Sequence, residues 1–205
     1  MNSKLKLQEV EEKARKIFGE NFIGLSEACA VLGKTLKEKE LRSFCFFSID
    51  DIALERYAKQ GFCLITVPVR MTVKEIITAA PNLFVFNLSD GEMYSLSKEI
   101  IKPGRYLVKR EPTYKSFNKM MMQEMGILSE NNPKLVEVMC AFALTHLTGK
   151  RRMLIERICV ICKEEVQRRF GKAHLCFQKD SGTAIKIGVW LSQIPSLSSL
   201  PIKRA

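Results

Sequence analysis

The sequence feature that most limits the possible folds is an apolar run at residues 62–69, Phe-Cys-Leu-Ile-Thr-Val-Pro-Val. It is rich in β-branched and aromatic residues and too uniformly apolar for a surface helix. It predicts a strand that is buried on both faces. Shorter runs at 83–86 and 106–108 predict two more strands, and Pro112 ends the second because proline supplies no amide to a strand ladder.

Helical signals dominate the sequence before this run. Apolar residues three and four positions apart predict an amphipathic helix over residues 5–18, and Gly24 and Gly33 are expected breaks. Three further helix starts carry a hydroxyl residue followed three positions later by an acid, as in a capping box. These pairs are Thr35 with Glu38, Ser48 with Asp51, and Thr72 with Glu75.

The second half mixes helix and strand signals. A methionine-rich segment at 116–125 predicts a helix, and a second helix is expected from Asn132 as N-cap and Pro133 as first residue to Gly149. Apolar or alternating segments at 158–162, 173–177 and 184–190 predict strands, with a hairpin turn at 179–182. The tail at 195–201 is expected to be an irregular loop.

These elements predict an α+β fold. A helical N-terminal segment (residues 1–60) is followed by a basic α+β domain (residues 61–205), a compact mixed domain with a small antiparallel sheet. With 205 residues and 46% apolar content, the chain can bury a core without disulfides or metals.

Three features predict a cytoplasmic protein with reduced thiols. The seven cysteines are odd in number, no apolar leader follows Met1, and the longest apolar stretch, 136–144, is much shorter than the roughly 20 residues of a membrane span. We therefore expect no membrane span.

One segment suggests a resemblance. Residues 105–112, Arg-Tyr-Leu-Val-Lys-Arg-Glu-Pro, and residues 115–118, Lys-Ser-Phe-Asn, resemble a family of small uncharacterised proteins from candidate-phylum bacteria. The order of later elements is also similar: a proline-led helix, Thr148-Gly149-Lys150-Arg151, a strand, a hairpin and a basic tail. The similarity, mainly one of order and spacing, runs from about residue 48 to the end.

The resemblance implies a C-terminal region with the C-type-lectin fold of formylglycine-generating enzymes. The chain departs from the family at its aspartate-rich turn, replaced by Lys-Asp-Ser-Gly at 179–182, and at a tryptophan-aspartate-aspartate segment, replaced by Trp-Leu-Ser-Gln at 190–193. These departures weaken the case that the chain shares a ligand site with the family. The family also has no established activity that the resemblance could imply for this chain.

The charge of the chain is unevenly distributed. Residues 1–97 contain 13 Lys and Arg against 13 Asp and Glu, whereas residues 98–205 contain 20 against 9, so the second half carries the whole net charge of +11. Such an asymmetry indicates an anionic partner, either a nucleic acid or an acidic protein.

The excess positive charge forms two clusters that we consider candidate sites for anion or nucleic-acid binding. The first comprises Lys102, Arg105, Lys109, Arg110, Lys115 and Lys119, and the second includes Lys150, Arg151, Arg152, Arg168 and Arg169. If they share one face, they can neutralise several phosphates. Tyr106, Tyr114 and Phe117 interleave the first cluster and could stack on single-stranded bases.

Cysteine and histidine residues offer a weaker alternative. Cys159 and Cys162 have CxxC spacing, and His174 and Cys176 follow, which together could form a structural zinc set. However, positions i and i+3 of a strand point to opposite faces, which favours buried structural thiols. A thiol enzyme would need a cysteine beside His146 or His174.

The sequence contains no catalytic constellation and no cofactor motif, so no cofactor is predicted. We interpret the chain as a non-enzymatic binding protein that acts on an anionic partner or another macromolecule. An RNA-binding or DNA-binding basic protein is the first alternative, and a thiol- or metal-dependent enzyme is the second.

Overall fold

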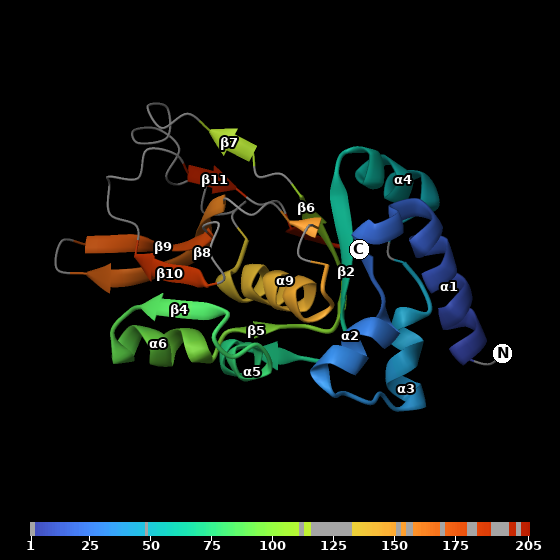
Figure 1. Ribbon diagram of the computed structural model, residues 1–205, viewed down its shortest axis with the longest axis horizontal. Coiled ribbons are helices and arrows are strands. Elements are labelled where there is room, and N and C mark those ends of the chain that lie inside the picture. Colours follow the sequence, from blue (N-terminus) through green and yellow to red (C-terminus); the bar gives the residue numbers. More distant parts are fainter. Residues whose placement is uncertain are drawn as a thin grey trace.

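Two antiparallel strands, β2 (Phe62–Val67) and β6 (Gly104–Lys109), form the middle of the fold in the computed structural model (Figure 1). Two short strands flank them and complete a four-stranded sheet in the order β1-β2-β6-β12. β1 (Phe22–Ile23) runs parallel to β2, and β12 (Ile202–Arg204) runs antiparallel to β6. The sheet therefore joins segments from the beginning, middle and end of the chain.

The structure describes residues 3–47, 49–110, 113–115, 133–150, 153–154, 158–168, 171–179, 184–189, 197–199 and 202–205. These residues form an α+β protein, as the sequence predicts. Within the described ranges, no helix has the length and apolar character needed to cross a membrane.

Strand β2 is buried on both faces because a layer packs on each side of it. On β2, Phe62 and Leu64 belong to a core cluster with residues of α1 (Ser3–Phe18) and α4 (Asp51–Lys59). The alternate residues Cys63, Ile65 and Val67 belong to a larger cluster that contains α9 (Leu135–Leu147). All six residues of β2 are buried, which confirms the strand predicted from the apolar run.

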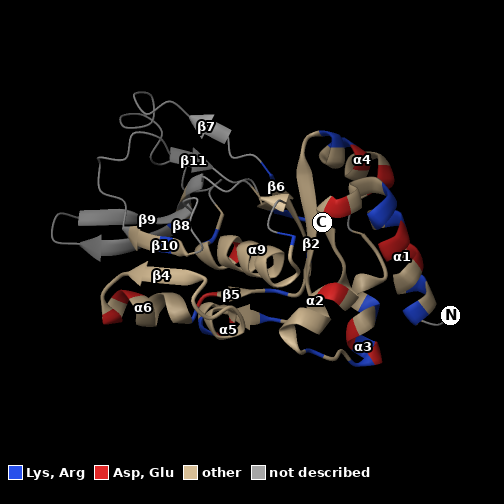
Figure 2. Ribbon diagram, in the orientation of Figure 1, with Lys and Arg blue, Asp and Glu red and all other residues tan. Residues whose placement is uncertain are grey.

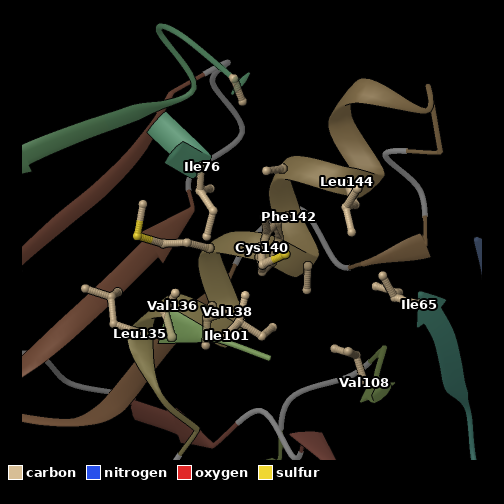
Figure 3. Close-up of a cluster of buried hydrophobic side chains, with 14 of the residues drawn as sticks. Ile65, Ile76, Ile101, Val108, Leu135, Val136, Val138, Cys140, Phe142 and Leu144 are labelled. Carbon is tan, nitrogen blue, oxygen red and sulfur yellow. The ribbon is translucent and has the colours of Figure 1, made fainter. Parts of the chain in front are cut away.

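Helix α9 is the centre of the larger core cluster. Ten of its thirteen residues are buried, as expected for a helix that is apolar on all sides and surrounded by protein. Figure 3 shows Val138, Cys140 and Phe142 of α9 among side chains from the sheet and from neighbouring elements. Ile23 and Ala28 belong to the same cluster, so the first 60 residues and the later part of the chain share a core.

A second sheet packs on the other side of α9 (Figure 1). Its strand order is β4-β10-β9-β8-β11-β7, with β4 parallel to β10 and β11 parallel to β8, while the remaining pairs are antiparallel. Its strands are β4 (Phe84–Asn87), β7 (Thr113–Lys115), β8 (Ile158–Arg168), β9 (Gly171–Lys179), β10 (Ile185–Val189) and β11 (Leu197–Ser199).

The other described elements are short. They are α2 (Leu25–Leu32), α3 (Glu38–Leu41), α5 (Val73–Ala79), α6 (Asp90–Ser97), the 3-10 helices η1 (Gly19–Asn21) and η2 (Arg42–Phe44), and the paired strands β3 (Met71–Thr72) and β5 (Ile100–Ile101).

Most of the predicted elements are confirmed. The amphipathic helix is α1, the strands predicted at 83–86, 106–108, 158–162, 173–177 and 184–190 correspond to β4, β6, β8, β9 and β10, and β9 pairs antiparallel with β10 as a hairpin requires. Gly24 and Gly33 are the N-cap and C-cap of α2. The methionine-rich helix and turn residues 180–183 lie outside the described residues.

Only one of the three predicted capping boxes is observed. The hydroxyl of Thr72 accepts a hydrogen bond from the Glu75 N–H at 3.2 Å, and the Glu75 carboxylate accepts one from the Thr72 N–H at 2.7 Å. Ser48 lies outside the described residues, and Asp50 caps α4 by accepting from the Ala53 N–H.

The predicted starts of two other helices are wrong. α3 begins at Glu38, and the Lys37 N–H donates to the carboxylate of Glu40, so Thr35 is not needed as a cap. α9 begins at Leu135 with Lys134 as N-cap. Pro133 stays outside the helix, and its carbonyl accepts from the Lys163 N–H of β8 at 2.9 Å. In both cases an acid three residues after the N-cap satisfies a free N–H.

The prediction of an irregular loop at 195–201 is wrong in part, because β11 occupies residues 197–199. β12, which follows at residues 202–204, was not predicted from the sequence. β11 pairs with β7 and β8, and β12 extends the first sheet beside β6. Three-residue strands carry little local signal, since their conformation depends on the strands beside them.

We expect Phe142→Ala to lower the free energy of unfolding by about 3–5 kcal/mol, because Phe142 is buried in α9 and its removal leaves a cavity. Ile52→Ala, at a position that is 82% exposed on α4, is the control and should change stability by less than about 0.5 kcal/mol. Urea unfolding measures both, and equal effects would contradict the assignment of α9 to the core.

Two hydrogen bonds from Thr72 hold the pKa of Glu75 below its usual value. The bond from the Thr72 backbone has the larger effect, and the bond from its side chain has the smaller one. Since the folded-state pKa is lowered, Glu75 contributes stability above its unfolded-state pKa, and this is lost as the pH falls through the folded-state pKa. We expect Thr72→Val, which removes only the hydroxyl, to raise the Glu75 pKa in an NMR titration. Thr78→Val removes a hydroxyl bonded to the Lys74 carbonyl and should leave the Glu75 pKa unchanged.

Candidate anion-binding pocket

A pocket of about 460 Å³ lies where the beginning of β6 meets the segment after α3 and the end of β12. We call it the arginine pocket, and its lining is Ser43, Phe44, Phe46, Phe47, Pro103, Gly104, Arg105, Arg204 and Ala205. Its volume falls within the roughly 300–1,000 Å³ of small-molecule sites. Residues far apart in the sequence thus meet at one concave site.

Arg105 is the most buried charged residue of the pocket, with 3% of its surface exposed. Its Nη1 donates a hydrogen bond to the Phe46 carbonyl at 3.0 Å, and its Nη2 donates one to the Phe44 carbonyl at 2.6 Å. The guanidinium also lies over the Phe47 ring, 4.6 Å from its centre. Arg105 therefore holds residues 43–47, the phenylalanine segment, against the sheet.

The hydrogen-bonding capacity of this buried group is not fully used. Within the described ranges, Arg105 Nε and the hydroxyl of Thr66 have no hydrogen-bond partner. The two residues are cross-strand neighbours on β6 and β2. Burial lowers the pKa of Arg105 and the nearby Glu11 raises it, but a guanidinium stays protonated in proteins. The base of the pocket thus carries a fixed positive charge.

Arg204, an exposed residue of the edge strand β12, also lines the pocket. Its Nη2 donates to the Pro103 carbonyl at 2.8 Å. A Cβ atom at Gly104 would lie 3.0 Å from Arg204 Nε, and Gly104 has a φ of 154°, which L-residues rarely adopt. Glycine at this position therefore lets the Arg204 side chain lie against the backbone.

The phenylalanine segment gives the pocket an apolar wall. Phe44 is buried, Phe47 is half-buried and Phe46 is 61% exposed. The ammonium of Lys6 on α1 lies over the Phe46 ring, 3.5 Å from its centre. None of the described side chains that line the pocket is an acid. The lining combines aromatic surface with two cations.

Further positive charge lies around the pocket. Arg42, Lys102 and Lys203 are exposed and directly adjoin lining residues in the sequence. Figure 2 shows that the outer helices α1, α3 and α4 carry both signs of charge, whereas α9 is almost uncharged. A cleft with cations in its lining and at its rim attracts anions.

The structure places the candidate basic residues in different environments. Lys102 and Arg105 belong to the arginine pocket or its rim, and Lys109 is half-buried. Arg110 Nε donates to the Met153 carbonyl at 3.3 Å. Only the backbone is described for Lys115 and Arg168, and Lys119, Arg151, Arg152 and Arg169 lie outside the described residues.

Lys150 joins distant segments. Its ammonium lies 2.8 Å from the Glu27 carboxylate and donates to the Phe22 carbonyl at 2.6 Å.

Tyr106 does not present a stacking surface, because it is buried and its hydroxyl donates to the Lys102 carbonyl. Burial raises the pKa of Tyr106 to about 12.

The cysteine candidates lie on two paired strands. Cys159 and Cys162 are on β8 and His174 and Cys176 are on β9, with Cys176 in register with Ile161. Cys162 is fully buried in the larger core cluster. In the part of the chain that the structure describes, no three potential ligands are grouped to hold a metal ion.

The environment of three other thiols disfavours nucleophilic chemistry. Burial raises the pKa of Cys63 and of Cys140 to about 12, and it also raises that of Cys29. A nucleophilic cysteine needs the opposite shift, since the thiolate is the reactive form. His146 is half-buried in the last turn of α9.

Comparison with known proteins finds no matching family model, no matching curated protein and no matching solved structure. The resemblance to lectin-like proteins therefore stays a prediction, and the arginine pocket is interpreted from its own chemistry.

Sequence reasoning missed Arg204, Gly104 and the phenylalanine segment as parts of a site. One local signal was available, because three of the chain's twelve phenylalanines lie within the four residues 44–47. Nothing in the sequence connects this segment with Arg204.

We expect Arg105→Lys to lower the free energy of unfolding by about 1.5–3 kcal/mol, because lysine cannot donate to both the Phe44 and Phe46 carbonyls in the same geometry. Hydrogen exchange at residues 43–47 should accelerate as well. Arg204→Lys, at an exposed position, is the control and should change stability by less than about 0.5 kcal/mol. Unchanged stability and exchange in Arg105→Lys would contradict the role of Arg105 in holding this segment.

Proposed function

We propose that this protein is a non-enzymatic binding protein whose ligand is anionic and binds in the arginine pocket. The observation that carries the proposal is a pocket of small-molecule size that is lined by Arg105, whose guanidinium is buried and held in place, and by the exposed residue Arg204. Guanidinium groups form strong hydrogen bonds with carboxylates and phosphates.

The composition of the lining favours binding over catalysis. Among its described residues, Ser43 carries the only hydroxyl, and none is a cysteine, a histidine or an acid that could activate it. The raised pKa values of the buried thiols also disfavour the thiol-enzyme alternative. We further propose a cytoplasmic location, which is supported by the unpaired state of Cys29, Cys45, Cys63 and Cys140.

A small anion explains the described contacts better than an extended nucleic-acid footprint. Arg105, Arg110 and Lys150 of the two basic clusters bond to carbonyl groups of the protein itself. The exposed cations that remain in the described ranges include Arg42, Lys102 and Lys203, which adjoin the arginine pocket.

NMR titration with small anions at low salt tests the proposal. We expect inorganic phosphate and phenyl phosphate to shift the amide signals of Gly104, Arg105 and Phe46. Arg204→Gln should weaken binding about tenfold, because it removes a charged donor from the lining. Lys59→Gln removes the same charge from an exposed position at the end of α4, which neither lines the pocket nor adjoins a lining residue, and should weaken binding less than about threefold.

Two outcomes would contradict the proposal. One is the absence of any anion-dependent shift in the wild-type protein. The other is binding of random single-stranded RNA that depends steeply on salt but is unaffected by Arg204→Gln, which would instead favour a nucleic-acid surface elsewhere.

A further inference from the structure

The charged residues at the arginine pocket indicate the charge of its ligand. Arg105 and Arg204 line the pocket, and three exposed cations adjoin the lining in sequence. The acid that acts on Arg105 is Glu11, which does not line the pocket, and its carboxylate accepts a hydrogen bond from the Leu25 N–H at the start of α2. A doubly charged anion therefore gains more from this environment than a singly charged one, because Coulomb energy scales with charge.

The apolar wall of the pocket indicates which uncharged group the ligand carries beside its anionic group. Phe46 is 61% exposed and lines the pocket together with the two arginines, with the Lys6 ammonium over its ring, and Phe47 carries the Arg105 guanidinium on its face. A flat ring that covers Phe46 would remove apolar surface from water and gain the energy of aromatic stacking. Simple inorganic phosphate offers no such contact.

Resting on the proposed function, we infer that the ligand of the arginine pocket is a small phosphate monoester joined to a flat aromatic or heteroaromatic ring. The phosphate lies at Arg204, within the field of Arg105, and the ring lies against the phenylalanine segment. Arg105 is held by two carbonyls and by the Phe47 ring, so its charge is in place before the ligand arrives. Such preorganisation reduces the entropy lost on binding.

Three probes separate the contributions of charge and ring. Phenyl phosphate carries both features, inorganic phosphate lacks the ring, and methyl phenyl phosphate keeps the ring but has a single charge. We expect NMR titration at pH 7.5 to show phenyl phosphate binding about tenfold more tightly than either of the others.

Two substitutions assign these contributions to residues. Arg204→Gln should weaken phenyl phosphate and inorganic phosphate about equally, since both place a phosphate at Arg204. Phe46→Ala should weaken phenyl phosphate roughly two- to tenfold and leave inorganic phosphate unchanged. Ile52→Ala removes an exposed apolar side chain from α4 and should affect neither ligand. Phe46 is exposed, so its substitution should leave the fold intact.

The outcomes distinguish this inference from the proposed function. Equal affinities for the three probes, still reduced by Arg204→Gln, would overturn the phosphate monoester and ring but keep an anion-binding pocket. No binding that depends on Arg204 would overturn both. A third outcome is that a 5′-phosphorylated oligonucleotide binds and the corresponding mononucleotide does not. The ligand would then be the end of a nucleic-acid strand, and the inference of a small molecule would be overturned.

Discussion

The burial of β2 on both faces is the constraint on which the rest of the structure depends. A strand with six consecutive buried residues needs an apolar layer on each side and a paired backbone along each edge. Helices α1 and α4 supply one layer, and α9 supplies the other. β6 satisfies one edge of β2, and the two residues of β1 pair with the middle of the other. The arrangement of the N-terminal helices around this strand follows from that requirement.

Arg105 and Thr66 are the buried polar residues of this sheet within the described ranges. A buried guanidinium is costly unless protein groups replace the hydration that it loses. The carbonyls of Phe44 and Phe46 and the ring of Phe47 do so, but Nε and the Thr66 hydroxyl have no partner within the described ranges. A charge held in a poorly solvated place acts more strongly on its surroundings than one on an open surface. Under the proposed function, this field attracts the anion to the neighbouring pocket.

The sequence predicts the elements whose signal is local and misses those that depend on pairing. β2, β6 and α1 follow from apolar content and period, whereas β1, β11 and β12 are two or three residues long and exist because a longer strand lies beside them. The site divides in the same way. The clustering of basic residues in the sequence is enough to identify Lys102 and Arg105 as candidate site residues. Arg105 bonds to carbonyls 59 and 61 residues away, and Arg204 bonds to one 101 residues away, so no spacing rule could have joined them.

The charge asymmetry of the chain acquires a structural meaning from these contacts. The neutral half supplies the groups that hold basic side chains of the other half: Glu27 pairs with Lys150, and the carbonyls of residues 44 and 46 bind Arg105. It also supplies the aromatic wall of the arginine pocket. A run of basic residues in a sequence is therefore not equivalent to a basic surface, because part of its charge binds the protein's own chain. Under the proposed function, the charges that matter are those that the fold places beside a cavity, and Arg204, which lies outside both predicted clusters, is one of them.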